Sequence, residues 1–151
     1  MALGEFTDVS RVRFLTSSNK FLAIEELAQV FLNSDVCSDL EELVRTLKER
    51  EEIMSTGIGF GIAIPHVKNS AIKKIGFAVG VSREGINFDS MDGEPVHLII
   101  LIVAGEKEHR EYLGLLSRIM DILKTPGVKD KIIAASSTQQ IFDIIGEYKS
   151  R

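Results

Sequence analysis

The most informative segment of this chain is Ser55-Thr-Gly-Ile-Gly-Phe-Gly-Ile-Ala-Ile-Pro-His66. Its three alternate glycines allow positive φ angles and close approach of the backbone. Residues 62–64 then predict a short buried strand. Pro65 fixes its own φ at about −65° and keeps the residue before it extended. We therefore expect His66 to be held by a stiff backbone at the end of a core element, where an imidazole can react at neutral pH.

Length and composition indicate one globular domain over residues 1–151, with 44% hydrophobic and 26% charged residues. The net charge of −4 argues against nucleic acid or an anionic membrane surface as the main partner. The longest apolar run, Leu98 to Ala104, is too short to span a bilayer. Residues 1–6 lack the features of a signal peptide. Cys37 is the only cysteine, which excludes a disulfide framework. We expect a cytoplasmic protein.

Apolar runs and alternation predict strands on both sides of the glycine segment. The runs lie at residues 9–15, 62–64, 75–82 and 97–104, and turn residues follow one another at 83–89 and 91–95. The run at 97–104 is apolar enough to be a central strand.

Helical periodicity predicts helices between these strands and after them. The expected helices start near residue 21, at Ser38, near residue 109, at Val128 and after Ser137. Capping boxes are expected at Ser38–Glu41 and Ser137–Gln140. The apolar faces comprise Ile24, Leu27, Ala28, Phe31 and Leu32; Leu40, Leu43, Val44 and Leu47; Tyr112, Leu115, Leu116, Ile119, Ile122 and Leu123; and Ile141, Ile144, Ile145 and Tyr148. Strands with flanking helices imply an α/β fold, a three-layer α/β/α sandwich.

The glycine spacing does not match a nucleotide-binding loop. Ile62 stands where a dinucleotide fingerprint would place its third glycine, and the glycines precede a strand instead of following one. A zinc site would need three or four ligands, and only His66 and His109 are candidates. No serine, cysteine or paired-carboxylate arrangement is selected by spacing. We therefore expect neither a cofactor nor a metal.

The three histidines lie in different settings. His97 opens the apolar run of 97–104, and we interpret it as a strand-edge residue without chemistry. His109 falls in the first turn of a predicted helix, where backbone N–H groups favour anions. It is either a site residue or a solvated surface histidine. Arg50, which precedes the glycine segment, is likewise either an anion-binding group or one more charge on a solvated helix face.

Histidines and an arginine can transfer a phosphoryl group without a metal. An imidazole nitrogen attacks phosphorus in line, and charge spreads over three equatorial oxygens. The planar fork of arginine suits those oxygens. His66, His109 and Arg50 are therefore the candidate catalytic residues.

These motifs, in this order, resemble a known family. They are Arg50-Glu, the segment from Ser55 to His66, Gly-Glu-Pro-Val-His-Leu-Ile at 93–99, and Glu-His109 opening a leucine-rich helix. The pattern is similar to the fructose/mannitol-type (type 2) enzyme IIA domain of the bacterial phosphoenolpyruvate-dependent sugar phosphotransferase system. The resemblance extends from about residue 9 to residue 148, and it implies a sandwich around a mixed β-sheet.

The resemblance implies a phosphocarrier. His66 would accept a phosphoryl group from phospho-HPr and pass it to a cysteine of enzyme IIB in a fructose- or mannitol-type permease. His109 and Arg50 would hold the phosphate. No metal and no nucleic acid would take part, and the membrane would be reached only through the permease. Ile58, Phe60 and Val67 are either part of an apolar docking rim or core residues.

Two other functions stay open at this point. The first is a regulator similar to the nitrogen-related enzyme IIA, in which the phosphorylated state of His66 controls partner binding. The second is a binding domain that keeps only the scaffold. The chain also departs from many relatives at Val67-Lys68, where Gly or Ala and then Arg are usual, and at Gly105, where proline is common. Both departures concern the rim and not the three candidate residues.

Overall fold

A computed structural model describes residues 3–147, and its strands form a mixed six-stranded sheet in the order β1-β5-β6-β3-β2. β4 lies beside β6 on the same edge as β3. The strands are β1 (Val12–Phe14), β2 (Gly57–Gly59), β3 (Ile62–Ala63), β4 (His66–Lys68), β5 (Gly76–Ile86) and β6 (Val96–Ala104). β5 and β6 are antiparallel, whereas β1 runs parallel to β5, and β3 and β4 run parallel to β6.

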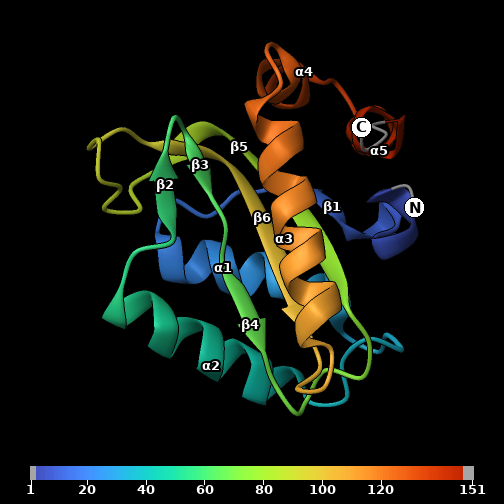
Figure 1. Ribbon diagram of the computed structural model, residues 1–151. Coiled ribbons are helices and arrows are strands. Elements are labelled where there is room, and N and C mark those ends of the chain that lie inside the picture. Colours follow the sequence, from blue (N-terminus) through green and yellow to red (C-terminus); the bar gives the residue numbers. More distant parts are fainter. Residues whose placement is uncertain (1–2, 148–151) are drawn as a thin grey trace.

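Helices cover both faces of this sheet (Figure 1). The α-helices are α1 (Lys20–Ala28), α2 (Leu40–Ile53), α3 (His109–Lys124), α4 (Val128–Ala134) and α5 (Thr138–Glu147). Short 3-10 helices are η1 (Leu3–Phe6), η2 (Val9–Arg11) and η3 (Gln29–Phe31). Among the described residues, no helix is both long and apolar enough to cross a membrane.

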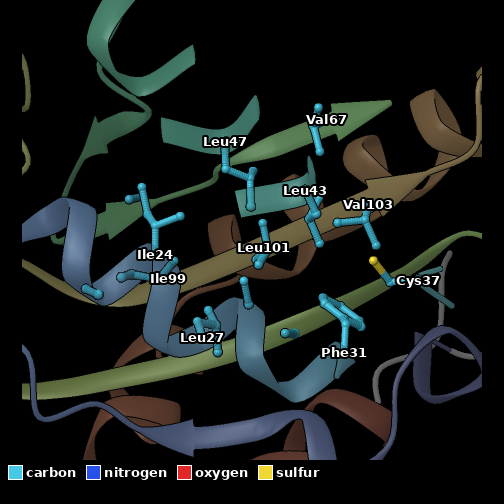
Figure 2. Packing of buried hydrophobic residues seen from close by; sticks show 14 of the residues in the cluster. Ile24, Leu27, Phe31, Cys37, Leu43, Leu47, Val67, Ile99, Leu101 and Val103 are labelled. Carbon is cyan, nitrogen blue, oxygen red and sulfur yellow. The ribbon is translucent and has the colours of Figure 1, made fainter. Parts of the chain in front are cut away.

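The central strand β6 shows why the fold has three layers. Its side chains alternate between the two faces of the sheet, as strand geometry requires. Ile99, Leu101 and Val103 pack with α1 and α2, as Figure 2 shows, whereas the residues between them pack with α3, α4 and α5. A strand buried on both faces needs a continuous apolar run, which residues 98–104 supply. The predicted three-layer α/β/α sandwich with a mixed sheet is confirmed.

Several predicted element boundaries were wrong. The first strand is shorter than residues 9–15, because residues 9–11 form η2. β5 continues past Ser82 to Ile86 through an irregularity that includes Gly85 at φ +90°, where a turn was predicted. Leu32 was expected on the buried face of the first helix, but η3 ends before it and its side chain is 56% exposed.

Helix caps also differ from the prediction by one residue. Asp39, not Ser38, caps α2, and its carboxylate accepts a hydrogen bond from the Glu42 backbone N–H. Ser38 instead donates its hydroxyl to the Ala71 carbonyl. Ser137 does accept from the Gln140 backbone N–H, but Gln140 Oε1 accepts from Ser136 and not from Ser137. Tyr148, predicted on the buried face of the last helix, lies outside the described residues.

The glycine segment folds as a β-hairpin, which the sequence interpretation missed. β2 and β3 are antiparallel and are joined by the two residues Phe60 and Gly61, at φ +57° and φ +77°. Positive φ at both turn positions is the geometry that matches the twist of a hairpin. Phe60 adopts it without being glycine because both of its backbone groups are held. Its N–H donates to Asp92 Oδ2 at 2.9 Å, and its carbonyl accepts from Lys129 Nζ at 2.7 Å.

Candidate functional site

His66 begins a new strand immediately after a break in the sheet. Pro65 separates β3 from β4 and has no N–H to donate to a neighbouring strand. Its carbonyl accepts from the Ile102 N–H at 3.0 Å, while the Ile64 N–H turns to the Thr56 carbonyl at 3.0 Å. The backbone on both sides of the break is therefore fixed, and His66 is half-buried opposite Ile102 of β6.

The His66 ring is oriented by the backbone two residues before it. Nδ1 lies 2.7 Å from the Ile64 carbonyl oxygen. A carbonyl oxygen can only accept a hydrogen bond, so Nδ1 carries the hydrogen. In the neutral ring, Nε2 then keeps its lone pair and is the nitrogen available as a nucleophile.

Lys68 lies on the same side of β4 as His66. Val67 between them belongs to the core under α1 and α2, so its two neighbours face the α3 side of the sheet. There Lys68 Nζ lies 2.6 Å from Nδ1 of His109, the first residue of α3. An ammonium group only donates, so Nδ1 of His109 accepts and its Nε2 carries a hydrogen. His109 is thus a hydrogen-bond donor at Nε2, complementary to His66.

The Tyr112 ring contacts both His66 and Lys68. Its ring centroid lies 6.0 Å from that of His66, and Lys68 Nζ lies 5.9 Å from the centroid of the tyrosine ring. Tyr112 is buried, and burial raises the pKa of its phenol, an effect that the positive charge of Arg50 partly offsets. His66 and Lys68 therefore contact the buried ring of Tyr112, and Arg50 is close enough to act on it electrostatically.

Arg50 and His66 line the same groove. The groove has a volume of about 890 Å³ and lies between the last turns of α2, the residues that enter β2, the Ile64–His66 segment, and Leu116 and Met120 of α3. Arg50 is exposed on the last turns of α2. An arginine in the same groove as a nucleophilic imidazole supplies positive charge to any anion bound there.

The structure places two of the three predicted site residues, Arg50 and His66, in the same groove. His109 does not line that groove, and its link to His66 is indirect, through Lys68 and the Tyr112 ring. His97 lies at the other end of β6, where its Nδ1 bonds to the Ser82 carbonyl at 2.8 Å, as a structural residue would. Within residues 3–147, no group of three His, Cys, Asp or Glu side chains is placed to hold a metal ion.

Sequence reasoning missed Lys68 and Tyr112. Lys68 was noted only as a departure from related sequences, and Tyr112 only as part of an apolar stripe. The signal was present in both cases. Lys68 lies two residues after His66 on a strand, and Tyr112 lies three residues after His109 on a helix, and these spacings put each pair on one face.

Comparisons with known proteins identify the family. The model of the family "Phosphoenolpyruvate-dependent sugar phosphotransferase system, EIIA 2" matches residues 5–148. The chain therefore belongs to this family of enzyme IIA phosphotransfer proteins.

Three curated relatives differ in length and in name. The chain is 33% identical to the fructose-specific EIIABC component of Bacillus subtilis, over 89% of this chain and 21% of that protein. It thus spans about a fifth of that relative. It is 38% identical to the fructose-specific EIIA component of Haloferax volcanii, over 83% of this chain and 81% of that protein. It is 33% identical to a nitrogen regulatory protein of Bradyrhizobium diazoefficiens, over 87% and 85%.

Solved structures share the fold. Nitrogen regulatory protein IIA-Ntr from Neisseria meningitidis superposes with a TM-score of 0.84 at 26% identity, covering 95% of this chain and 98% of that one. Enzyme IIA of the mannitol system of Escherichia coli, solved in complex with phosphorylated enzyme IIB, gives a TM-score of 0.80 at 18% identity, over 93% and 97% of the two chains.

Proposed function

We propose that His66 carries a phosphoryl group on Nε2, accepting it from phospho-HPr and passing it to a cysteine of enzyme IIB. The observation that carries this proposal is the hydrogen bond from Nδ1 of His66 to the Ile64 carbonyl, which in the neutral ring leaves the lone pair on Nε2. Membership of the enzyme IIA family supports it. The relatives named fructose-specific favour a fructose-type permease as the destination of the phosphoryl group.

The first step forms a phosphorus–nitrogen bond. The Nε2 lone pair attacks phosphorus in line, the bond between phosphorus and the donor breaks, and its electron pair leaves with the donor. Nδ1 keeps its hydrogen throughout, bonded to Ile64. In the second step the thiolate of enzyme IIB attacks the same phosphorus, and the electron pair of the phosphorus–nitrogen bond returns to Nε2.

Three positive or donor groups stabilise the transferred phosphoryl group. Arg50 offers its guanidinium from α2, and His109 offers Nε2–H from α3. Lys68 fixes that tautomer of His109 and adds a positive charge. Donors that are already in place before the reaction stabilise the developing charge without reorganisation.

An apolar rim beside the site suits a transient partner. Ile53, Met54, Ile58 and Phe60 are 83%, 75%, 42% and 78% exposed, and the first three line the groove of His66. Scattered exposed apolar residues are ordinary, but a group of them around one groove indicates a protein contact. Of the two interpretations left open for Val67, the core interpretation holds, because its side chain is fully buried. Ile58 and Phe60 remain rim residues in this proposal.

The same proposal places the protein in the cytoplasm. The test of the proposed function is a phosphate relay reconstituted from purified components. Phosphoenolpyruvate, enzyme I and HPr should label the wild-type chain, and enzyme IIB of a fructose-type permease should then discharge the label. A chain that is labelled but not discharged by any enzyme IIB would favour the regulatory function, which the nitrogen regulatory relatives support. A chain that takes no label would contradict the proposal.

A further inference from the structure

Glu51 is a buried carboxylate that the phosphoryl-transfer scheme above does not use. Its side chain is 1% exposed, although its chain neighbours Arg50 and Glu52 are exposed. A buried charge is costly unless both carboxylate oxygens find donors. Glu51 meets this condition, and its partners show what it connects.

The donors to Glu51 come from two other parts of the chain. Thr56, just before β2, donates its hydroxyl to Oε1 at 2.5 Å and its backbone N–H to Oε2 at 3.0 Å. Lys20, the first residue of α1, donates Nζ to Oε2 at 3.4 Å and also pairs with Asp89 at 3.1 Å. The carboxylate therefore fastens the end of α2 to α1 and to the start of the glycine hairpin.

A continuous series of hydrogen bonds leads from this carboxylate to the His66 ring. Thr56, held by Glu51, accepts from the Ile64 N–H at 3.0 Å through its backbone carbonyl. The Ile64 carbonyl, on the same residue, accepts from Nδ1 of His66 at 2.7 Å. The position of the acceptor that fixes the His66 tautomer thus depends on where Glu51 holds Thr56.

We propose that Glu51 is a positioning residue for His66, acting through Thr56 and the backbone of Ile64. It holds the Ile64 carbonyl where Nδ1 must donate, and so keeps Nε2 free. The same carboxylate fixes the last turn of α2, from which Arg50 reaches the groove. The catalytic meaning of this role rests on the phosphoryl-transfer function proposed above, but the effect on the His66 ring does not.

The experiment measures the His66 ring and the transfer rate in the same variants. In Glu51→Gln and Thr56→Val, the ring ¹⁵N signals of His66 should move from one tautomer toward a mixture. Phosphorylation by phospho-HPr should slow by about tenfold, as expected when a reacting group is misplaced. Thr56→Ser keeps the hydroxyl donor and should restore both readouts.

Glu25→Gln is the matched control, because Lys48 and Glu25 also join α1 to α2 through a 2.7 Å ion pair that does not involve Thr56. This variant should behave as wild type. If Glu51→Gln does not fold, Thr56→Val decides alone, since it keeps the Lys20–Glu51 pair.

Unchanged ring signals in Thr56→Val would overturn the proposal, even with slower transfer, because the carboxylate would then serve stability only. A wild-type chain that takes no phosphate would refute the proposed function, whereas the ring signals would still decide the role of Glu51.

Discussion

Nζ of Lys68 lies 2.6 Å from Nδ1 of His109, and this contact joins the strand that carries His66 to the first turn of α3. It makes His109 a donor at Nε2 while His66 stays an acceptor at its own Nε2. Two histidines with opposite tautomers can bind one phosphoryl group in different roles, one as the nucleophile and the other as a hydrogen-bond donor.

Lys68→Met should slow phosphorylation of His66 by roughly tenfold to a hundredfold. This is less than the loss of a donor that touches the phosphoryl group, because Lys68 acts in part through His109. Lys68→Arg keeps the positive charge and a hydrogen-bond donor, so it should recover most of the rate that Lys68→Met loses. Stopped reactions with labelled phospho-HPr measure both rates. Equal rates for Lys68→Met and wild type would show that Lys68 takes no part in phosphorylation.

Arg50→Ala and His109→Ala should each slow phosphorylation by roughly tenfold to a thousandfold without abolishing it, because both groups stabilise the phosphoryl group and neither attacks it. Arg45→Ala is the control for Arg50, since Arg45 is an exposed arginine on the same helix that pairs with Glu42 and Glu49. Complete loss of labelling in a folded His109→Ala protein would mean that His109 is itself the acceptor.

The expected result for Gly57→Ala is a loss of stability. A Cβ at Gly57 would lie 2.2 Å from Ser90 Oγ and 3.2 Å from Phe88 Cβ, so the hairpin cannot keep its place. We expect a loss of about 1–3 kcal/mol, the typical cost of overpacking. Gly114→Ala, on the exposed face of α3 with open space around it, should instead stabilise by about 0.5–1 kcal/mol. Urea unfolding compares the two, and similar behaviour of both variants would contradict the account.

The raised pKa of Tyr112 predicts that the free energy of unfolding falls in alkaline solution. Burial raises the pKa of Tyr112 above its ordinary value of 10.0, and Arg50 partly offsets this effect. Below that value the phenol is neutral in both states and the free energy of unfolding is unaffected. As the pH rises through it, the unfolded chain ionises first, so the folded state loses stability until the folded pKa is passed.

Tyr112→Phe should therefore lose less stability than wild type when the pH is raised above about 10. Unfolding by urea at a series of pH values measures this difference. The tyrosinate absorbance of Tyr112 should also appear at a higher pH than that of a free tyrosine. A parallel loss of stability in both proteins would show that Tyr112 does not titrate as the structure requires.

The layers of the fold could be predicted because they follow from local patterns. The apolar run of residues 98–104 predicts a strand buried on both faces, and the stripe at Tyr112, Leu115 and Ile119 predicts a helix packed on it. Both predictions are confirmed. The hairpin was missed because Gly57, Gly59 and Gly61 carry no side chains, so the period of a strand cannot be seen in them.

The predicted ends of helices and strands were wrong where the local sequence allows more than one outcome. Ser38 and Asp39 are both good helix caps, and only the tertiary bond from Ser38 to Ala71 decides between them. Residues 83–89 were predicted as a turn, but pairing of Ile86 with Val96 of β6 extends β5 to Ile86. Such outcomes depend on contacts distant in the sequence.

The candidate site was predicted as three residues but not as an arrangement. His66 stood out because Pro65 follows an apolar strand, whereas Arg50 could equally have been a solvated charge. Their shared groove depends on β3 and β4 lying at the same edge of β6, and strand order was not readable from the sequence. Predicting Lys68 and Tyr112 as partners of the histidines would have required knowing where α3 packs on the sheet.

The decisive experiment for phosphoryl transfer by this protein is to map the phosphorylated atom. After incubation with phosphoenolpyruvate, enzyme I and HPr, we expect one acid-labile, base-stable phosphate on Nε2 of His66. Nuclear magnetic resonance of the ¹⁵N-labelled ring can identify that atom, and a folded His66→Ala protein should take no label. Phosphate on Nδ1 of His66, phosphate on another residue, or full labelling of the His66→Ala protein would contradict the account.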